Sequence, residues 1–192
     1  MSVLARIAAP LAVVLIGSPA LAHSGAGHST LLAGLLHPLG GWDHLAAMLA
    51  VGLWAGTSSG HARWAWPLAF VLGMAAGGTL GMLGLALPAT ESAIAFSMLA
   101  LGCATAAALR MPVALGVVLV AMLALTHGNA HGLEAPEAGA GLDFAIGFLL
   151  TTAALHVTGL AVGVAARRSG QRWLARGIGI GIALGGAAAA LG

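Results

Sequence analysis

The amino-acid sequence predicts an all-α, polytopic membrane protein in which a bundle of six transmembrane helices follows an N-terminal signal peptide. Hydrophobic residues make up 60% of the 192 residues and charged residues only 6%, which departs far from the composition of soluble domains. Apolar runs long enough to cross about 30 Å of hydrocarbon recur along the whole chain. The few arginines stand in short breaks between these runs and not in a basic patch, so the composition gives no sign of nucleic-acid binding.

The first 22 residues have the pattern of a secretory signal. A short segment with Arg6 precedes an apolar run to Ile16, and Ala20-Leu21-Ala22 forms a small-residue cleavage site. We therefore predict a signal peptide at 1–22 and a transmembrane domain at 23–192. An uncleaved first anchor helix is the alternative.

Six apolar spans follow, with short polar or proline-containing breaks between them. The backbone of each must satisfy its hydrogen bonds internally, which predicts helices. Their approximate ranges are 30–56, 65–87, 92–109, 112–132, 142–166 and 173–192.

The arginines set the predicted orientation. They fall between spans one and two, three and four, and five and six, which places all of them on the cytoplasmic side. They are Arg63, Arg110, Arg167, Arg168, Arg172 and Arg176, whereas Glu91, Glu134, Glu137 and Asp143 fall on the opposite side. The sequence thus predicts a multi-pass protein of the bacterial inner membrane, with both mature termini in the periplasm.

Tryptophan and glycine positions predict how the bundle is anchored and packed. We expect Trp54, Trp64, Trp66 and Trp173 to lie at the cytoplasmic headgroups. Glycines four residues apart allow helices to approach closely in lipid. These series are Gly73/Gly77/Gly81, Gly159/Gly163 and Gly177/Gly181/Gly185.

Span four carries His127, His131 and Glu134, which are spaced i, i+4 and i+7. On a helix this spacing places all three side chains on one face, within about 60° of one another. The pattern predicts a strip of ligands in the last turns before the outer surface. A polar helix end that meets interfacial water is the alternative, above all for Glu134.

Span one carries His37 and, further along, Asp43 and His44. The two histidines are seven residues apart and stack on one face of a regular helix, whereas Asp43 points about 100° away. Pro38, Gly40 and Gly41 stand between them and can unwind the helix, which could bring Asp43 to the same cavity. Alternatively, Asp43 and His44 form a structural hydrogen-bonded pair.

Together the two segments supply four imidazoles and two carboxylates. An ionisable side chain in a hydrophobic span costs roughly 2.5–3.5 kcal/mol, so a functional reason is expected for each. Nitrogen and oxygen donors of this kind suit a divalent ion such as Ni²⁺ or Co²⁺. We predict a metal permease in which His127, His131 and His37 capture the ion and Asp43 and His44 receive it, with Asp43 or Glu134 alternatively supporting a ligand.

Three further histidines are candidate metal ligands. His156 lies in span five near mid-depth, where a hydrogen-bonded buried histidine is an equal alternative. His23 and His28 could gather metal at the mature N-terminus, but a short tract of this kind is a weak signal.

The two segments resemble the signature of the HupE/UreJ family of nickel and cobalt permeases. That family has a His-x5-Asp-His pattern in its first mature span, matched here by His37 and Asp43-His44. Its Phe-His-Gly-x-Ala-His-Gly-x-Glu pattern in the fourth span is matched from His127 to Glu134, with Thr126 in place of Phe. The resemblance covers essentially the whole chain. It implies selective Ni²⁺ uptake that supplies the maturation of hydrogenase or urease.

Other classes of function are less well supported. The chain has no lysine and no phosphate-binding loop, so we expect passive or secondary transport by a protein that is not an enzyme. We expect no permanently bound cofactor, with Ni²⁺ or Co²⁺ as substrate, lipid and downstream maturation factors as partners, and a homo-oligomer as an open option. The alternative function is a membrane haem protein for electron transfer with bis-His ligation, although the adjacent carboxylates argue against it.

Overall fold

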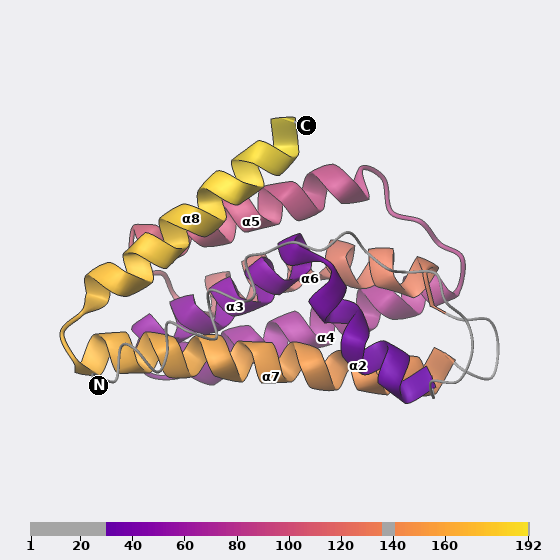
Figure 1. The fold of residues 1–192 in the computed structure, drawn as a ribbon, viewed down its shortest axis with the longest axis horizontal. Coiled ribbons are helices and arrows are strands. Elements are labelled where there is room, and N and C mark those ends of the chain that lie inside the picture. Colours follow the sequence, from indigo (N-terminus) through magenta and orange to yellow (C-terminus); the bar gives the residue numbers. More distant parts are fainter. Residues whose placement is uncertain (1–29, 136–140, 192) are drawn as a thin grey trace.

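The computed structural model describes residues 30–135 and 141–191. The predicted signal peptide, His23, His28 and Glu137 therefore lie outside the described residues. Within those ranges the chain forms seven α-helices and no strand (Figure 1). This confirms the all-α class.

The first predicted span is two helices rather than one. Helix α2 covers Thr30–Gly40 and α3 covers Trp42–Thr57. Gly41 between them has an extended backbone with φ −104° and ψ 113°. Pro38 lies inside α2, so the break falls directly after the segment in which proline and paired glycine weaken a helix. The break changes the direction in which Asp43 and His44 project relative to His37.

The other helices follow the predicted spans within a few residues. They are α4 (Ala62–Met82), α5 (Thr90–Ala106), α6 (Val113–Leu133), α7 (Gly141–Arg168) and α8 (Arg172–Leu191). Of these, α4, α6, α7 and α8 are long and apolar enough to cross a membrane, whereas α2 and α5 are shorter apolar helices. The chain is thus a multi-pass membrane protein, and the count of six spans stays a prediction.

The helices pack as pairs along a common direction. Helix α4 runs along α6, α3 and α2 run along α7, and α5 lies beside α8 (Figure 1). We call one end of the bundle the histidine end; there α2, the last turns of α6 and the start of α7 meet. The opposite end, where α7 finishes and α6 and α8 begin, is called the arginine end.

Glycines allow the paired helices to approach closely. In α4 and α7 these include the glycines that the four-residue spacing predicted. A Cβ at Gly77 would clash with the backbone of α6 at Leu125, and one at Gly159 would clash with the backbone of α3 at Leu49. In α8 the predicted series holds only at Gly185, which packs against Trp42, because Gly177 and Gly181 face open space. The contact with α5 is made instead by Gly179 and Gly186.

Two of the four predicted tryptophan anchors were also misplaced. Trp64 and Trp173 are exposed as expected, but Trp54 and Trp66 are fully buried, with ring centroids 4.2 Å apart. Their indole N–H groups donate to the carbonyls of Leu109 and Val113, at 2.9 and 3.2 Å. The pair therefore fixes the turn between α5 and α6 from inside the bundle. A buried indole is well suited to this role because its one polar group finds a partner.

The contact between α5 and α8 can be tested with two glycines of the same helix. Gly179→Ala places a Cβ within 2.6 Å of the Ala106 backbone nitrogen, so we expect it to destabilise the protein by about 1–3 kcal/mol through overpacking. Gly181→Ala is the matched control, since nothing lies within 4 Å of its Cβ. Thermal unfolding in detergent should show a lower midpoint for Gly179→Ala only. Equal midpoints would contradict the observed pairing.

Candidate metal centre

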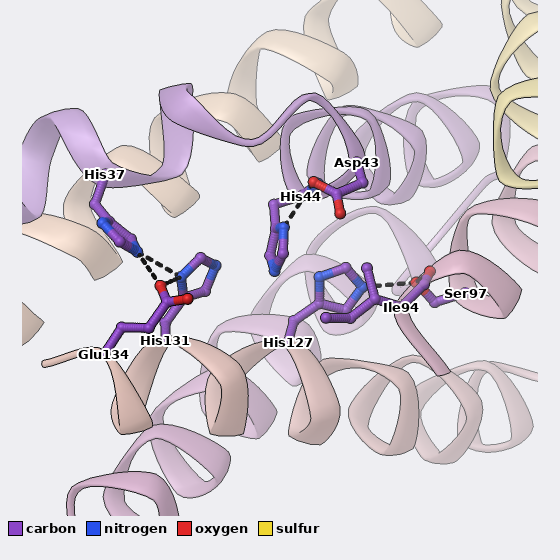
Figure 2. Close-up of polar contacts among 8 residues, drawn as sticks. All are labelled: His37, Asp43, His44, Ile94, Ser97, His127, His131 and Glu134. Carbon is purple, nitrogen blue, oxygen red and sulfur yellow. Dashed lines mark hydrogen bonds and ion pairs between the residues drawn. The ribbon is translucent and has the colours of Figure 1, made fainter. Parts of the chain in front are cut away.

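Four histidines of α2, α3 and α6 form a continuous row that begins at the histidine end and runs into the bundle (Figure 2). His37 contacts His131 with 4.7 Å between ring centroids, His131 contacts His44 at 4.2 Å, and His44 contacts His127 at 4.8 Å. The side chain of His37 is 29% exposed, whereas His127 is completely buried. The row therefore connects the surface with the interior.

The outer part of the row contains a possible three-ligand site, which we call the outer trio: His37, His131 and Glu134. The His37 Nε2 atom lies 2.8 Å from His131 Nδ1 and 3.1 Å from Glu134 Oε2, and the latter two atoms are 3.9 Å apart. Donor atoms bound to one ion at about 2.0–2.1 Å lie about 3 Å from each other. The outer trio therefore has the spacing and the chemistry to hold a divalent ion.

Glu134 follows the last residue of α6, and its side chain is 62% exposed. The hydrogen bond from His37 lowers the pKa of the Glu134 carboxyl below its usual value, and partial burial opposes this effect only in part. Because a carboxylate can only accept, the proton in this contact belongs to His37 Nε2. Glu134 thus offers a negative charge at the surface end of the row.

The inner part of the row has polar atoms without partners. His44 Nε2, His127 Nδ1 and His131 Nε2 are buried and make no hydrogen bond within the part of the chain that the structure describes. Leaving a buried polar atom unpaired typically costs about 1–3 kcal/mol. In Figure 2 the His44 ring lies between those of His131 and His127 and points toward α6. These three nitrogens are the second possible donor set, which we call the inner donor set.

Asp43 holds His44 in place and does not join the row. Its Oδ1 atom accepts hydrogen bonds from the His44 ring at Nδ1 and from the His44 backbone N–H, both at 2.8 Å. The ring proton is therefore on Nδ1, and Nε2 carries the lone pair. A carboxylate behind a histidine in this way orients the ring and makes it a better ligand.

Gly41 makes room for this arrangement. A Cβ at Gly41 would lie 2.9 Å from Asp43 Oδ1 and 3.1 Å from His44 Nδ1, so a larger residue would force the hydrogen-bonded pair to shift. At Gly40 nothing lies within 4 Å of the same atom. The second glycine of the pair is therefore the one that the site requires.

Two residues outside the predicted ligand set support the row. Ser97 of α5 is fully buried, and its Oγ lies 2.6 Å from His127 Nε2. Asn129 accepts a hydrogen bond from the Leu87 backbone N–H at 2.8 Å and donates to the Leu85 carbonyl at 2.7 Å. Asn129 thereby connects α6 to the loop that follows α4. This loop exists because α4 ends at Met82, five residues before the end of the predicted span. In the sequence, the position of Asn129 between His127 and His131 could have indicated its role, whereas nothing in the sequence indicated a role for Ser97.

His156 is buried on α7 and has no ring contact with the row. Its Nδ1 donates to the Thr152 carbonyl at 2.6 Å, and its Nε2 has no partner within the described residues. The Phe70 ring lies 4.9 Å from His156 and 5.7 Å from His127, between centroids. An apolar ring therefore contacts both His156 and the inner end of the row.

Comparison with known proteins gives a consistent result. The family model described as HupE / UreJ protein matches residues 11–189. The chain is 42% identical over 189 residues to Protein HupE of Rhizobium leguminosarum bv. viciae, which covers 97% of this chain and 98% of that protein. No solved structure matches the chain.

The two neighbouring glycines provide a test of the inner donor set. Gly41→Ala should displace the Asp43 carboxylate from His44 and weaken Ni²⁺ binding by roughly 10-fold or more, the usual effect of losing a ligand's support. Gly40→Ala should bind as the unmodified protein does. Isothermal titration calorimetry of both purified variants checks this. Equal affinities would show that the Asp43 to His44 contact does not support binding.

Proposed function

The chain belongs to the HupE/UreJ family, a family of nickel and cobalt permeases, and from this we propose that it carries Ni²⁺ across the bacterial inner membrane into the cytoplasm. Co²⁺ is the alternative cargo, since both ions accept nitrogen and oxygen donors. The proposed ligands are His37, His131 and Glu134 at the surface, followed by His44 and His127, with Asp43 behind His44.

The main support for this proposal is the set of buried, unpartnered imidazole nitrogens. The inner donor set consists of three buried imidazole nitrogens that have no hydrogen-bond partner in the described residues. The surrounding core is packed with apolar side chains. Buried polar atoms without a partner destabilise the protein unless something else binds there. A soft-to-borderline divalent cation that prefers nitrogen ligands is the occupant that this donor chemistry favours.

The geometry supports a definite order of steps. Hydrated Ni²⁺ first meets the outer trio. There His37 loses its Nε2 proton to water and takes one up at Nδ1, so that the Glu134 carboxylate and two imidazoles can replace part of the water shell of the ion. It then passes to His44 and His127. His127 is the deepest histidine of the row, so it acts after His131 and not together with it at capture as the sequence had suggested. Each step binds the ion well enough to select it and weakly enough to release it.

We extend the proposed path to His156 as the next ligand toward the arginine end. Its Nδ1 donates to a carbonyl, so its unpartnered Nε2 carries the lone pair that a metal needs. An ion that leaves His127 must pass the Phe70 ring to reach it. His23 and His28 keep their proposed part in gathering metal at the N-terminus.

The remaining parts of the proposal concern direction and partners. The arginine end is proposed as the cytoplasmic side, so the outer trio opens to the periplasm and the delivered Ni²⁺ supplies the maturation of a nickel enzyme. The transport is passive or secondary, because the chain has no phosphate-binding loop. A homo-oligomer remains compatible with this function.

The geometry disfavours the haem alternative. His44 contacts both His131 and His127 through its ring, at centroid separations of 4.2 and 4.8 Å. Two axial ligands must instead face each other across an open slot as wide as the porphyrin. The direct ring contacts of the row leave no such slot between these histidines.

The proposal predicts the outcome of a transport experiment. Purified protein in liposomes should take up ⁶³Ni²⁺, and His131→Ala should reduce the uptake by at least about 10-fold, because it removes a ligand of both donor sets. His44→Ala should have a similar effect. Initial rates are measured at equal protein content in the liposomes.

His61→Ala is the control for this experiment. His61 is an exposed histidine that precedes α4 and contacts Trp64, so its loss should leave uptake unchanged. Undiminished uptake by both row variants would remove the row from the mechanism. A haem absorption band that disappears in His44→Ala would favour the electron-transfer alternative instead.

A further inference from the structure

Ser97 lies behind His127, on the side away from the row (Figure 2). Its hydroxyl oxygen is 2.7 Å from the Ile94 carbonyl oxygen and 2.6 Å from His127 Nε2. Both contacts are buried. A buried hydroxyl between these two partners can satisfy only certain arrangements of protons.

The arrangement follows from counting hydrogen atoms. A serine hydroxyl has one proton to donate, and a carbonyl oxygen can only accept. The short contact with Ile94 therefore takes the Ser97 proton. The hydroxyl oxygen must then accept from His127, so the ring proton of His127 is on Nε2. A neutral imidazole has one such proton, and Nδ1 of His127 is left with the lone pair.

That nitrogen is the one that belongs to the inner donor set. His127 Nδ1 is buried and unpartnered within the described residues, and the His127 ring meets the His44 ring edge-on, at 88°. Asp43 fixes the other ring in the same manner, so that His44 also presents a lone pair. Two protein groups on different helices thus prepare neighbouring imidazoles for the same ion.

We propose that Ser97 is a positioning residue that keeps His127 in the tautomer whose Nδ1 can bind the transported ion. This inference rests on the proposed function, since it concerns the same ion and the same row. Ser97 itself does not touch the ion. Its oxygen accepts a hydrogen bond from the His127 Nε2–H group, which keeps the ring proton off the metal-binding Nδ1.

Two variants of equal shape isolate the hydroxyl group. Ser97→Thr keeps the hydroxyl, whereas Ser97→Val replaces it with a methyl group in a side chain of the same size. We expect Ser97→Thr to bind Ni²⁺ within about 2-fold of the unmodified protein and Ser97→Val to bind roughly 10-fold or more weakly. Ser97→Ala adds no atoms and should behave as Ser97→Val does, which covers the case that the larger side chains do not fit.

The readout is binding and spectroscopy as well as transport. Affinity is measured by calorimetry on purified protein, and Co²⁺ absorption bands report whether His127 remains a ligand. Equal loss in Ser97→Thr and Ser97→Val, with normal binding by Ser97→Ala, would assign the effect to shape and overturn the proposal. Normal binding by both Val and Ala variants would overturn it too. If the unmodified protein neither binds nor transports Ni²⁺, the proposed function itself fails.

A separate observation concerns the arginine end, where a cavity of about 460 Å³ opens. Four arginines from the α5–α6 turn, the end of α7 and the start of α8 line it, together with the first turn of α6. They are Arg110, Arg167, Arg172 and Arg176. Hydroxyl-bearing residues at the end of α3 complete one wall.

Within the described residues, no acidic side chain balances the charges around this arginine cavity. None of the four arginines forms an ion pair with an acidic residue among residues 30–135 and 141–191. Arg176 donates to the Ala106 carbonyl, but Arg167 Nε is buried and has no partner in the part of the chain that the structure describes. Guanidinium groups recognise phosphate oxygens through paired hydrogen bonds, and a helix N-terminus favours the same negative charge.

We propose that the arginine cavity binds a phosphate group, either the headgroup of an anionic phospholipid or free inorganic phosphate. Basic pockets between membrane helices are suited to such headgroups. The proposal does not depend on Ni²⁺ transport, because the cavity lies at the opposite end from the outer trio.

Thermal unfolding of the purified protein in neutral detergent tests this site. Phosphatidylglycerol should raise the midpoint by about 2–4 °C relative to phosphatidylcholine, and Arg167→Gln combined with Arg172→Gln should abolish the shift. Arg168→Gln is the control, since Arg168 is exposed and does not line the cavity. A shift with inorganic phosphate as well identifies the phosphate group alone as the ligand. No shift, or an equal shift in the double variant, would overturn the proposal.

Discussion

A neutral imidazole has two nitrogens and one proton, and this constraint governs the histidine row. Where the protein engages one nitrogen as a donor, the other keeps the lone pair. Asp43 does this for His44, Ser97 for His127 and the Thr152 carbonyl for His156. In each case the second nitrogen is buried and has no partner in the described residues. His44, His127 and His156 thus each keep one unpartnered nitrogen, as the proposed ligands of an ion would.

His131 differs from the others because both of its nitrogens face the row. Its Nδ1 accepts from His37 Nε2, which leaves its own proton on Nε2. It can therefore bind an ion in the outer trio as it stands. Binding through Nε2 requires the proton to move to Nδ1, so His131 cannot serve both donor sets at the same time. In the proposed path, the exchange of this proton separates capture from inward transfer into two steps.

The sequence predicted which histidines lie close together better than it predicted their surroundings. The i, i+4, i+7 spacing placed His127 and His131 on one face of α6, and the proline and glycines after His37 indicated the break before α3. They could not reveal Ser97, because a hydroxyl on another helix leaves no periodic signal. Sequence position also misjudged Trp54 and Trp66, since an indole at a headgroup and one that donates to a carbonyl from inside the bundle look the same in the sequence. The packing face of α8 depended on which glycines met α5, and the spacing of glycines within α8 does not contain that information.

The distribution of negative charge along the row gives the proposed path a direction. At the surface Glu134 contributes a carboxylate to the outer trio itself. One step inward the nearest carboxylate is Asp43, which is hydrogen-bonded to the His44 ring. Beyond His127 the next contact is the Phe70 ring, and His156 offers a neutral nitrogen. A divalent ion therefore loses direct charge compensation with each step, which makes its binding progressively weaker along the row. Selection is strongest where the ion is captured, and release is easiest where it leaves, as transport by a sequence of sites requires.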